Sequence, residues 1–345
     1  MFIRSTGNIS PQPAFDEMLH APVVYTGNRL SSIEPDYSAI LDPKLIRRMS
    51  RIIKMGVAAA MACLNEAGIK DPGAIITGTA YGCLADTESF LVKMVENKEE
   101  LLTPTAFIQS THNTVGAQIA LMLKCHNYNN TFVHRGFSFE NSLLDAVSLI
   151  HEGDASTVLV GGVDEITATS HTILSRFGLY KNHLDGSDNL YHNTERGTIA
   201  GEGAAFFILS KESSGNDYAQ LKSLYTFYKP LHQSDVEKEI ENFLTAESMA
   251  LNDIDLVIWG KNGNTADDAV YNQLEKTLFR DHQTLNYKHL CGEYPTSSAF
   301  ALWYAANILK TGVAPVPENG KEPKTILIYN HYQQIHHSLY LLSAC

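Results

Sequence analysis

The sequence predicts an α/β protein in which helices cover the faces of a buried sheet. Short runs of β character alternate with longer segments whose apolar residues recur at a helical period. The chain has 345 residues, 44% apolar and 19% charged, which is enough for one large domain or two fused halves. The polar stretch at residues 211–217 is the best candidate for the linker between two halves. We therefore expect an N-terminal half over residues 1–210 and a C-terminal half over residues 211–345.

In the N-terminal half, a first strand is expected at residues 2–7 and is expected to end at Gly7. Residues 43–67 carry apolar side chains at helical spacing between an early Pro43 and a terminating Gly68, which predicts one helix. The other predicted elements of this half are a strand at 74–79, a turn and helix at 104–123, a strand at 130–133, a helix at 142–151, and strands at 157–162 and 204–209.

The C-terminal half repeats the same alternation. Residues 256–260 form a short apolar run that predicts a strand buried on both faces, and residues 297–310 predict a helix. The runs at 325–329 and 338–342 are rich in β-branched, aromatic and leucine side chains, so they predict a closing pair of strands.

The composition excludes several classes of function. The net charge of −12 argues against a nucleic acid or an anionic membrane surface as partner. No run of about 18 residues is apolar throughout, and the first residues lack a signal-peptide core, so we expect a cytoplasmic protein without a membrane span. Five cysteines without a C-x-x-C pair predict reduced, mostly buried thiols. We expect no cofactor and no metal, because His331, His336 and His337 lack the ligand set of a zinc site and predict a surface cluster.

Several stretches of the chain share one resemblance, in order and at suitable spacing. They are residues 6–11, residues 47–51 with the Ala-rich helix that follows, residues 153–165, residues 196–205 with the run Gly201-Glu202-Gly203-Ala204, and residues 297–308 with the turn 312–315. Together they resemble the β-ketoacyl synthases of the thiolase superfamily. The resemblance implies a thiolase-like five-layer α-β-α-β-α fold made of two similar halves. It also implies an obligate dimer, in which the edge strand near the nucleophile continues the sheet of the partner.

Members of that family perform decarboxylative condensation with a cysteine nucleophile and two histidines. With Asn129 and Thr131 upstream and Gly153 downstream as anchors, the cysteine column falls on Gly136. Glycine has no side chain and cannot hold an acyl group as a thioester. The resemblance therefore implies that this chain lacks the nucleophile of its relatives.

Both histidine columns have changed as well. The first histidine should follow the strand at 256–260, but the loop 260–268 contains none, and Asn262 occupies the column. The second should follow Lys288 in a Lys-x-x-x-Gly-His pattern, and Glu293 stands there instead. The glycine-rich turn that the family carries near the C-terminus is replaced by residues 330–334. We therefore expect no catalytic residue at the degenerate columns Gly136, Asn262 and Glu293.

Other residues leave room for an enzyme. Ser138 could be a nucleophile at a helix start, although a serine at a helix N-cap is far commoner. His134 beside Arg135 could be an acid–base pair, or a buried histidine with a hydrogen-bond partner. Glu293 could act as a base if burial raised its pKa. With Ser138, His134 or Glu293 the chain would be an atypical acyltransferase, decarboxylase or thioesterase of acyl carrier thioesters.

Two further readings stay open at this point. If the loop around Gly136 is shifted, Cys125 or Cys291 could be the nucleophile. The chain could also be a homodimeric acyl-binding protein that has no active partner.

The resemblance favours a non-catalytic subunit. Relatives with a replaced cysteine act as chain-length factors, which pair with an active ketosynthase subunit and shape the tunnel that limits chain growth. The chain most resembles the short, divergent ketosynthase-like proteins of bacterial aryl polyene or flexirubin-type pigment clusters. We expect a heterodimer with an active ketosynthase, or a homodimer, through the edge strand at residues 129–133, with acyl carrier protein engaged indirectly. The pocket or tunnel candidates are His134, Arg135, Phe137, Ser138, Phe139 and Lys288.

Overall fold

The protein is described by a computed structural model over residues 1–47, 49–315 and 322–345. Within this part of the chain, ten strands form one mixed sheet. The strands are β1 (Phe2–Ile9), β2 (Ala74–Gly78), β3 (Tyr128–Phe132), β4 (Thr157–Asp164), β5 (Gly203–Ser210), β6 (Ala219–Tyr228), β7 (Leu256–Trp259), β8 (Gln283–Asn286), β9 (Thr325–Tyr332) and β10 (His336–Ser343).

The sheet consists of two halves with the same strand order. The order is β3-β2-β4-β5-β1 followed by β6-β10-β9-β7-β8, so the second half reads as the first one reversed. In the first half β2 is parallel to β3 and β4, whereas β5 is antiparallel to its neighbours β4 and β1. The second half repeats this pattern, because β7 is parallel to β8 and β9, whereas β10 is antiparallel to its neighbours β9 and β6. The halves meet where Phe2 and Ile3 pair with Gln220 and Ala219.

Helices separate and cover the two halves of the sheet. The α-helices are α1 (Phe15–His20), α2 (Pro43–Ile46), α3 (Arg51–Ala67), α4 (Leu84–Glu96), α5 (Pro104–Gln109), α6 (Thr114–Leu123), α7 (Ser138–Glu152), α8 (Ala168–Arg176), α9 (Gln233–Ala246), α10 (Thr265–Lys276), α11 (Lys288–Cys291) and α12 (Ser298–Thr311). Short 3-10 turns are η1 (Tyr37–Ala39), η2 (Arg135–Phe137), η3 (Ser187–Asn189) and η4 (Leu251–Asp253).

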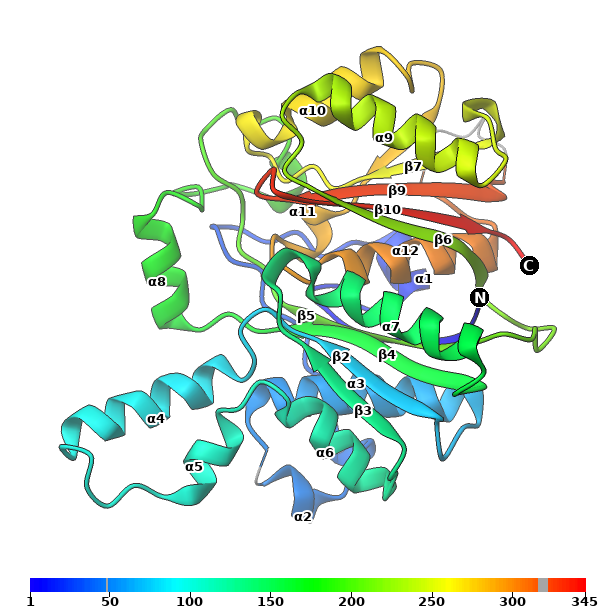
Figure 1. Cartoon of the computed structure of the whole chain (residues 1–345). Helices are drawn as coiled ribbons and strands as arrows, with labels where there is room; N and C mark the ends of the chain where they lie inside the picture. The colour runs from blue at the N-terminus through cyan, green and yellow to red at the C-terminus, as the bar shows by residue number, and fades with distance from the viewer. Residues whose placement is uncertain (48, 316–321) are drawn as a thin grey trace.

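Three apolar clusters define five layers. In one, α3 and α6 pack on the outer face of the first half of the sheet. In the second, α7 and α12 lie between the two halves and contact both, and in the third, α9 and α10 cover the outer face of the second half (Figure 1). This arrangement confirms the predicted α/β, thiolase-like fold with two similar halves. The boundary between residues 210 and 211 stays a prediction.

Some element boundaries differ from the prediction; the turn and helix expected at 104–123, for example, are the two helices α5 and α6. Strand β1 does not end at Gly7 but continues to Ile9. Gly7 is needed inside the strand because a Cβ there would lie 2.0 Å from the carbonyl oxygen of Ala59 in α3. The single helix predicted from Pro43 is two helices, α2 and α3, while Gly68 ends α3 in the left-handed conformation as predicted. Arg48 of this segment lies outside the described residues.

Several strands and helices were not predicted at all, namely α1, α4, β6, α8, α9, α10, β8 and α11. Helix α4 has no buried residue among its described positions, so its apolar side chains do not mark a core-facing stripe. Strand β6 is mostly half-buried or exposed beyond Leu221, which leaves a weak alternation. The helix predicted to begin at residue 142 instead begins at Ser138.

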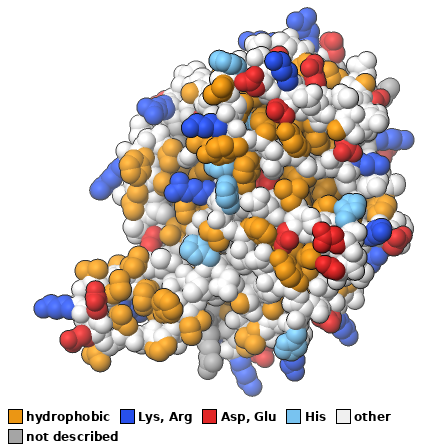
Figure 2. Space-filling view, viewed as in Figure 1, with side chains coloured by type: hydrophobic (Ala, Val, Ile, Leu, Met, Phe, Trp, Pro, Cys, Tyr) orange, Lys and Arg blue, Asp and Glu red, His pale blue; other side chains and the backbone are white. Residues whose placement is uncertain are grey.

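An arm made of α4 and α5 projects from the body of the molecule (Figure 1). Apolar side chains gather on it, as the orange atoms at the lower left of Figure 2 show. Its exposed apolar residues are Leu91, Val92, Val95, Leu101, Phe107 and Ile108, with Val95 76% and Leu101 93% exposed. A contiguous apolar surface of this kind is typical of a protein interface. No helix within the described residues is long and apolar enough to cross a membrane.

Candidate functional site

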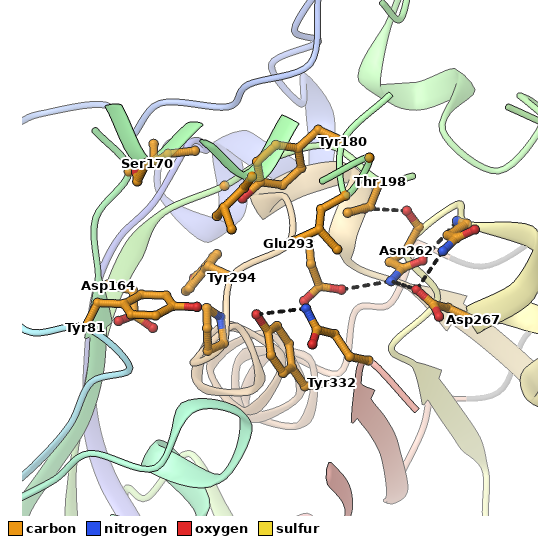
Figure 3. A pocket seen from close by; sticks show the side chains of 18 of the residues that line it. Tyr81, Asp164, Ser170, Tyr180, Thr198, Asn262, Asp267, Glu293, Tyr294 and Tyr332 are labelled. Carbon is orange, nitrogen blue, oxygen red and sulfur yellow. Dashed lines mark hydrogen bonds between the residues drawn. The ribbon is translucent and has the colours of Figure 1, made fainter. Parts of the chain in front are cut away.

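A partly open cavity lies where strands of both halves end. It encloses about 830 Å³ up to and including its open mouth. Tyr81 follows β2, Asp164 ends β4, Asn262 follows β7 and Tyr332 ends β9, and all four line the cavity (Figure 3). The carboxyl ends of parallel strands are where α/β sheets bind ligands, and here the two halves contribute equivalent ends to one site.

The loop after β7 holds Asn262 in the cavity wall. Asp268, near the start of α10, accepts hydrogen bonds from the backbone N–H groups of Asn262 and Gly263 at 2.8 and 2.9 Å. Thr198 Oγ1 donates to the Asn262 carbonyl oxygen at 2.6 Å. The side-chain Nδ2 of Asn262 donates to Asp267 Oδ2 and to Glu293 Oε2, both at 3.1 Å. Asn262 and Glu293, the residues expected at the two histidine columns, are therefore hydrogen-bonded to each other.

Glu293 is held from both sides. Its backbone pairs with the segment around Ala200, since Glu293 N donates to Ile199 O at 2.8 Å and Gly201 N donates to Glu293 O at 3.1 Å. Gly201 has no room for a side chain, because a Cβ would lie 2.0 Å from the carbonyl oxygen of Cys291. The close backbone approach that this glycine permits fixes the place of Glu293 in the cavity wall.

Lys288 lies behind Glu293 as a buried ion-pair partner. It is fully buried, and its Nζ donates to Glu293 Oε2 at 2.7 Å. Burial raises the pKa of Glu293, and the adjacent Lys288 ammonium opposes that rise. Because a buried charge without a partner is strongly unfavourable, each of these two residues requires the other.

Two more carboxyl groups line the cavity at the end of β4. Asp164 accepts hydrogen bonds from Thr79, Ala80 and Thr296, and burial raises its pKa to about 6. Burial also raises the pKa of Glu165 to about 7, although a hydrogen bond from the Ala85 N–H acts in the opposite direction and lowers it. A carboxyl group with such a pKa exchanges its proton near neutral pH, so this wall can act as an acid or a base.

Two side chains lie against Gly136, the residue expected at the nucleophile column. Gly136 lies in η2 and is buried, and a Cβ built on it would lie 2.7 Å from Tyr332 Cβ and 3.0 Å from His336 Cβ. Tyr332 belongs to the segment that replaces the glycine-rich turn of the family, and it lines the cavity. The space that a nucleophilic side chain would need at Gly136 is therefore taken by Tyr332 and His336.

Three of the pocket candidates lie elsewhere, on an open groove. His134, Arg135 and Phe137 line it together with Tyr228 and His336. The exposed His134 ring stacks on Phe137 with centroids 5.8 Å apart, and the His336 and Phe137 rings form a T-shaped pair with centroids 4.7 Å apart. The reading of His134 as a buried histidine is wrong, because this side chain is exposed.

Ser138 and Phe139 are fully buried and stand apart from the cavity wall. Ser138 is the first residue of α7 rather than its N-cap, and its Oγ accepts a hydrogen bond from the His134 N–H at 2.8 Å. Phe139 packs in the core against Phe207, with ring centroids 5.9 Å apart. Neither contact brings the Ser138 hydroxyl to the imidazole of His134.

Cys125 and Cys291 are buried, and so are two of the three histidines near the C-terminus. Burial raises the pKa of the Cys125 and Cys291 thiols, which is the opposite of what an activated nucleophile requires. The predicted surface cluster of histidines is wrong for two of its members. His331 and His337 are buried, and burial lowers their pKa values to about 3 and about 4. In the described part of the chain, no group of three or more His, Cys, Asp or Glu side chains could hold a metal ion.

Sequence reasoning missed most of the cavity wall. The residues it did not single out are Tyr81, Asp164, Glu165, Tyr180, Arg196, Tyr294 and Tyr332. For Asp164 and Glu165 a signal was present, since acidic residues directly after a buried strand mark the ligand-binding edge of such sheets. The tyrosines carried no comparable signal, because they come from separate loops that only the fold brings together.

The family of the chain follows from its sequence. The model of the β-ketoacyl synthase N-terminal domain matches residues 20–214, which is more than half of the chain. The chain therefore belongs to the β-ketoacyl synthase family, and its divergent cavity belongs to a ketosynthase-like protein. No curated protein sequence matches it.

Solved structures with the same fold cover the whole chain. The ishigamide ketosynthase/chain length factor superimposes with a TM-score of 0.82 at 15% identity, over 100% of this chain and 98% of that one. A β-ketoacyl synthase from Burkholderia phymatum gives 0.79 at 15% identity over 100% and 99%. The ketosynthase ApeO in complex with its chain length factor ApeC from Xenorhabdus doucetiae gives 0.80 at 13% identity over 100% and 98%. At 13–15% sequence identity, these superpositions show that the chains share a fold.

Proposed function

We propose that this member of the β-ketoacyl synthase family is a subunit without condensing activity that pairs with an active ketosynthase and bounds its acyl tunnel, as a chain-length factor does. The observation that carries the proposal is Gly136. A condensing enzyme needs a thiolate at this position, and here the place of its side chain is filled by Tyr332 and His336.

The two histidine columns support the same reading. Asn262 and Glu293 hydrogen-bond to each other, and Lys288 neutralises the carboxylate. In the family the two histidines stabilise the enolate or help to remove the carboxylate. An ionised carboxylate only accepts hydrogen bonds, so Glu293 cannot donate one to an enolate oxygen as a histidine can.

Two surfaces favour assembly with a partner of the same fold. Strand β3 is the outermost strand of the first half of the sheet, and no other strand of the described residues pairs with its outer side. An uncovered edge strand invites pairing with another chain. The apolar arm of α4 and α5 adds surface that a monomer would leave in water (Figure 2). In our proposal the partner's sheet continues at β3, with Val133 and Tyr128 near the contact.

The proposed partner is an active ketosynthase, and acyl carrier protein docks on that partner. A homodimer is the second form that the same surfaces allow. The pathway we propose is a cytoplasmic type II fatty acid or polyketide synthase of the kind that makes aryl polyene or flexirubin-type pigments. Two of the structures with this fold are described as ketosynthase and chain length factor, which supports the pairing.

One alternative keeps a specific observation in its favour. Glu293 lines the cavity, is buried and has a raised pKa, so a decarboxylase or thioesterase could use it as an acid or base. The versions that use Ser138 or His134 have less support, because Ser138 is buried in the core and His134 lies on the separate open groove.

The experiment that tests the proposal is reconstitution with the complete ketosynthase of the same gene cluster. The partner alone, this chain alone and the two together are supplied with acyl carrier thioesters, and the products are resolved by length. We expect products of defined length only from the pair. Condensation by this chain alone, or an unchanged product from the partner alone, would contradict the proposed role.

The dimer surface has its own test. Val133→Asp, at the end of the edge strand, is expected to dissociate the assembly, as measured by light scattering at micromolar concentration, because an unpaired carboxylate would be buried at the contact. Leu231→Asp is the matched control, since Leu231 is exposed on the second half of the molecule. A wild-type chain that is monodisperse and monomeric, alone and with the partner, would contradict the proposed assembly.

A further inference from the structure

The cavity contains a buried acceptor that has no partner. Oε1 of Glu293 makes no hydrogen bond within the described residues, although the residue is only 8% exposed. Its other oxygen, Oε2, accepts hydrogen bonds from Lys288 Nζ at 2.7 Å and from Asn262 Nδ2 at 3.1 Å. Buried polar atoms are nearly always paired in folded proteins, so an unpaired oxygen at a cavity wall indicates a missing donor.

The contacts of Glu293 settle which role Oε1 can take. Lys288 is fully buried, and a buried ammonium needs an anionic partner. Both groups that bind Oε2 are donors, which fits an ionised carboxylate. An ionised carboxylate only accepts hydrogen bonds, so Oε1 requires a group that carries a hydrogen.

The rest of the wall favours a positive charge. Four tyrosines line the cavity, and the faces of such rings attract cations; they are Tyr81, Tyr180, Tyr294 and Tyr332. Acidic side chains outnumber basic ones among the described lining residues. The acids are Asp164, Glu165, Asp267 and Glu293, whereas Arg196, an exposed residue, is the basic one. An anionic ligand would meet this wall unfavourably.

Apolar side chains complete the cavity on the side of α8. Leu174 belongs to α8 and Leu179 follows it, and Leu84 and Pro295 also line the cavity, so the body of a ligand would meet apolar surface while its head met the carboxylate. Leu174 is half-buried, whereas Ile173, the residue before it on α8, is 47% exposed and does not line the cavity.

We propose that this cavity binds a small molecule with a cationic amine head and an apolar body, whose amine N–H donates a hydrogen bond to Oε1 of Glu293. The site occupies the two degenerate histidine columns, so the loss of the condensing residues left a binding site of different chemistry. This inference goes beyond the proposed subunit role and does not depend on a partner.

Binding of two probes of similar size to the full-length chain tests the proposal. Phenethylamine carries the proposed head and body, and phenylacetate carries an anion on the same body. Isothermal titration calorimetry is expected to give a dissociation constant at least about tenfold lower for the amine than for the carboxylate. Equal affinity, tighter binding of the carboxylate, or no binding of the amine at millimolar concentration would overturn the proposal.

Variants then place the binding in the cavity. Glu293→Gln removes the charge and is expected to weaken amine binding about tenfold or more, with circular dichroism as a check of folding. Because this variant leaves Lys288 unpaired, Leu174→Trp provides an independent test that fills the apolar side of the cavity. We expect Leu174→Trp to abolish amine binding and Ile173→Trp to leave it unchanged.

If Leu174→Trp bound the amine as well as the wild type does, the ligand would lie elsewhere and the proposal would be wrong. The outcome is separable from the subunit role, which is measured by product length in the reconstituted pair. A chain that sets product length without binding the amine would sustain the proposed function and refute this inference alone.

Discussion

The residue that we assign to the nucleophile column and the two that we assign to the histidine columns differ in their surroundings. At Gly136 the side chain is absent, and the space beside it is occupied by Tyr332 and His336. At Asn262 and Glu293 the histidines are replaced by polar groups that bind each other, and a partly open cavity remains in front of them. The first position has become part of the packing, whereas the second has become a polar wall. The first position is packed and the second lines a cavity, which is the difference that our proposal of a non-condensing subunit would explain.

The largest expected effect comes from removing the buried ion pair between Lys288 and Glu293. Lys288→Met leaves Glu293 as a buried carboxylate without its counterion, and we expect a loss of about 3–5 kcal/mol in the free energy of unfolding. Lys261→Met is the matched control, because Lys261 also forms an ion pair at 2.7 Å, but with Glu275, whose side chain is 30% exposed. That variant should lose about 1 kcal/mol. Urea denaturation measures the free energy of unfolding of both variants. Equal losses would contradict the view that the Lys288–Glu293 pair is the more buried and the more costly to break.

The next effect concerns protons in the same wall. Burial raises the folded-state pKa of Glu165 from its ordinary 4.5 to about 7, so the folded state binds its proton more tightly than the unfolded state does. The stability from this group is complete below pH 4.5 and is lost as the pH rises through 7. Glu165→Gln should therefore flatten the fall in stability over this range, by up to about 3 kcal/mol.

The measurement is the difference in unfolding free energy between wild type and variant at a series of pH values. Taking the difference removes the opposite contribution of the buried His331 and His337, whose lowered pKa values reduce stability on the acid side. Glu96→Gln on the exposed face of α4 is the control. A Glu165→Gln profile parallel to that of the wild type would show that Glu165 is not buried as described.

A smaller effect is expected at the nucleophile column. Gly136→Cys places a Cβ 2.7 Å from Tyr332 Cβ, and we expect this overpacking to cost about 1–3 kcal/mol. Adding Tyr332→Gly should recover part of that cost, which a double-mutant cycle measures. Neither variant should condense acyl thioesters, because both histidine columns are also lost. Turnover by Gly136→Cys alone would show that the histidine columns have been misassigned.

Much of the fold could be predicted from the sequence because its core elements carry strong patterns. Strands β4 and β7 are continuous apolar runs, and helix α3 has a buried face that ends at Gly68. Helix α4 could not be predicted in the same way, since none of its residues is buried in the described structure. The apolar residues of α4 recur at a helical period without marking a core-facing side. Periodicity alone does not distinguish an exposed apolar stripe from a buried one.

The site shows the same limit. Asn262 and Glu293 were each singled out from the sequence, but their hydrogen bond to each other was not predicted. The covering of Gly136 could not be foreseen, because it depends on how the end of β9 lies over a turn far away in the sequence. Phe139, a tunnel candidate on sequence grounds, packs against Phe207 because the first turn of α7 faces the core.

The most direct test of the account is the mass of this chain after exposure to acyl carrier thioester, alone and together with the active ketosynthase. The account predicts an acyl adduct on the ketosynthase and none on this chain, because Gly136 offers no nucleophile and the buried Cys125 and Cys291 thiols have raised pKa values. A stoichiometric acyl adduct on this chain, mapped to any of its residues, would contradict the central claim.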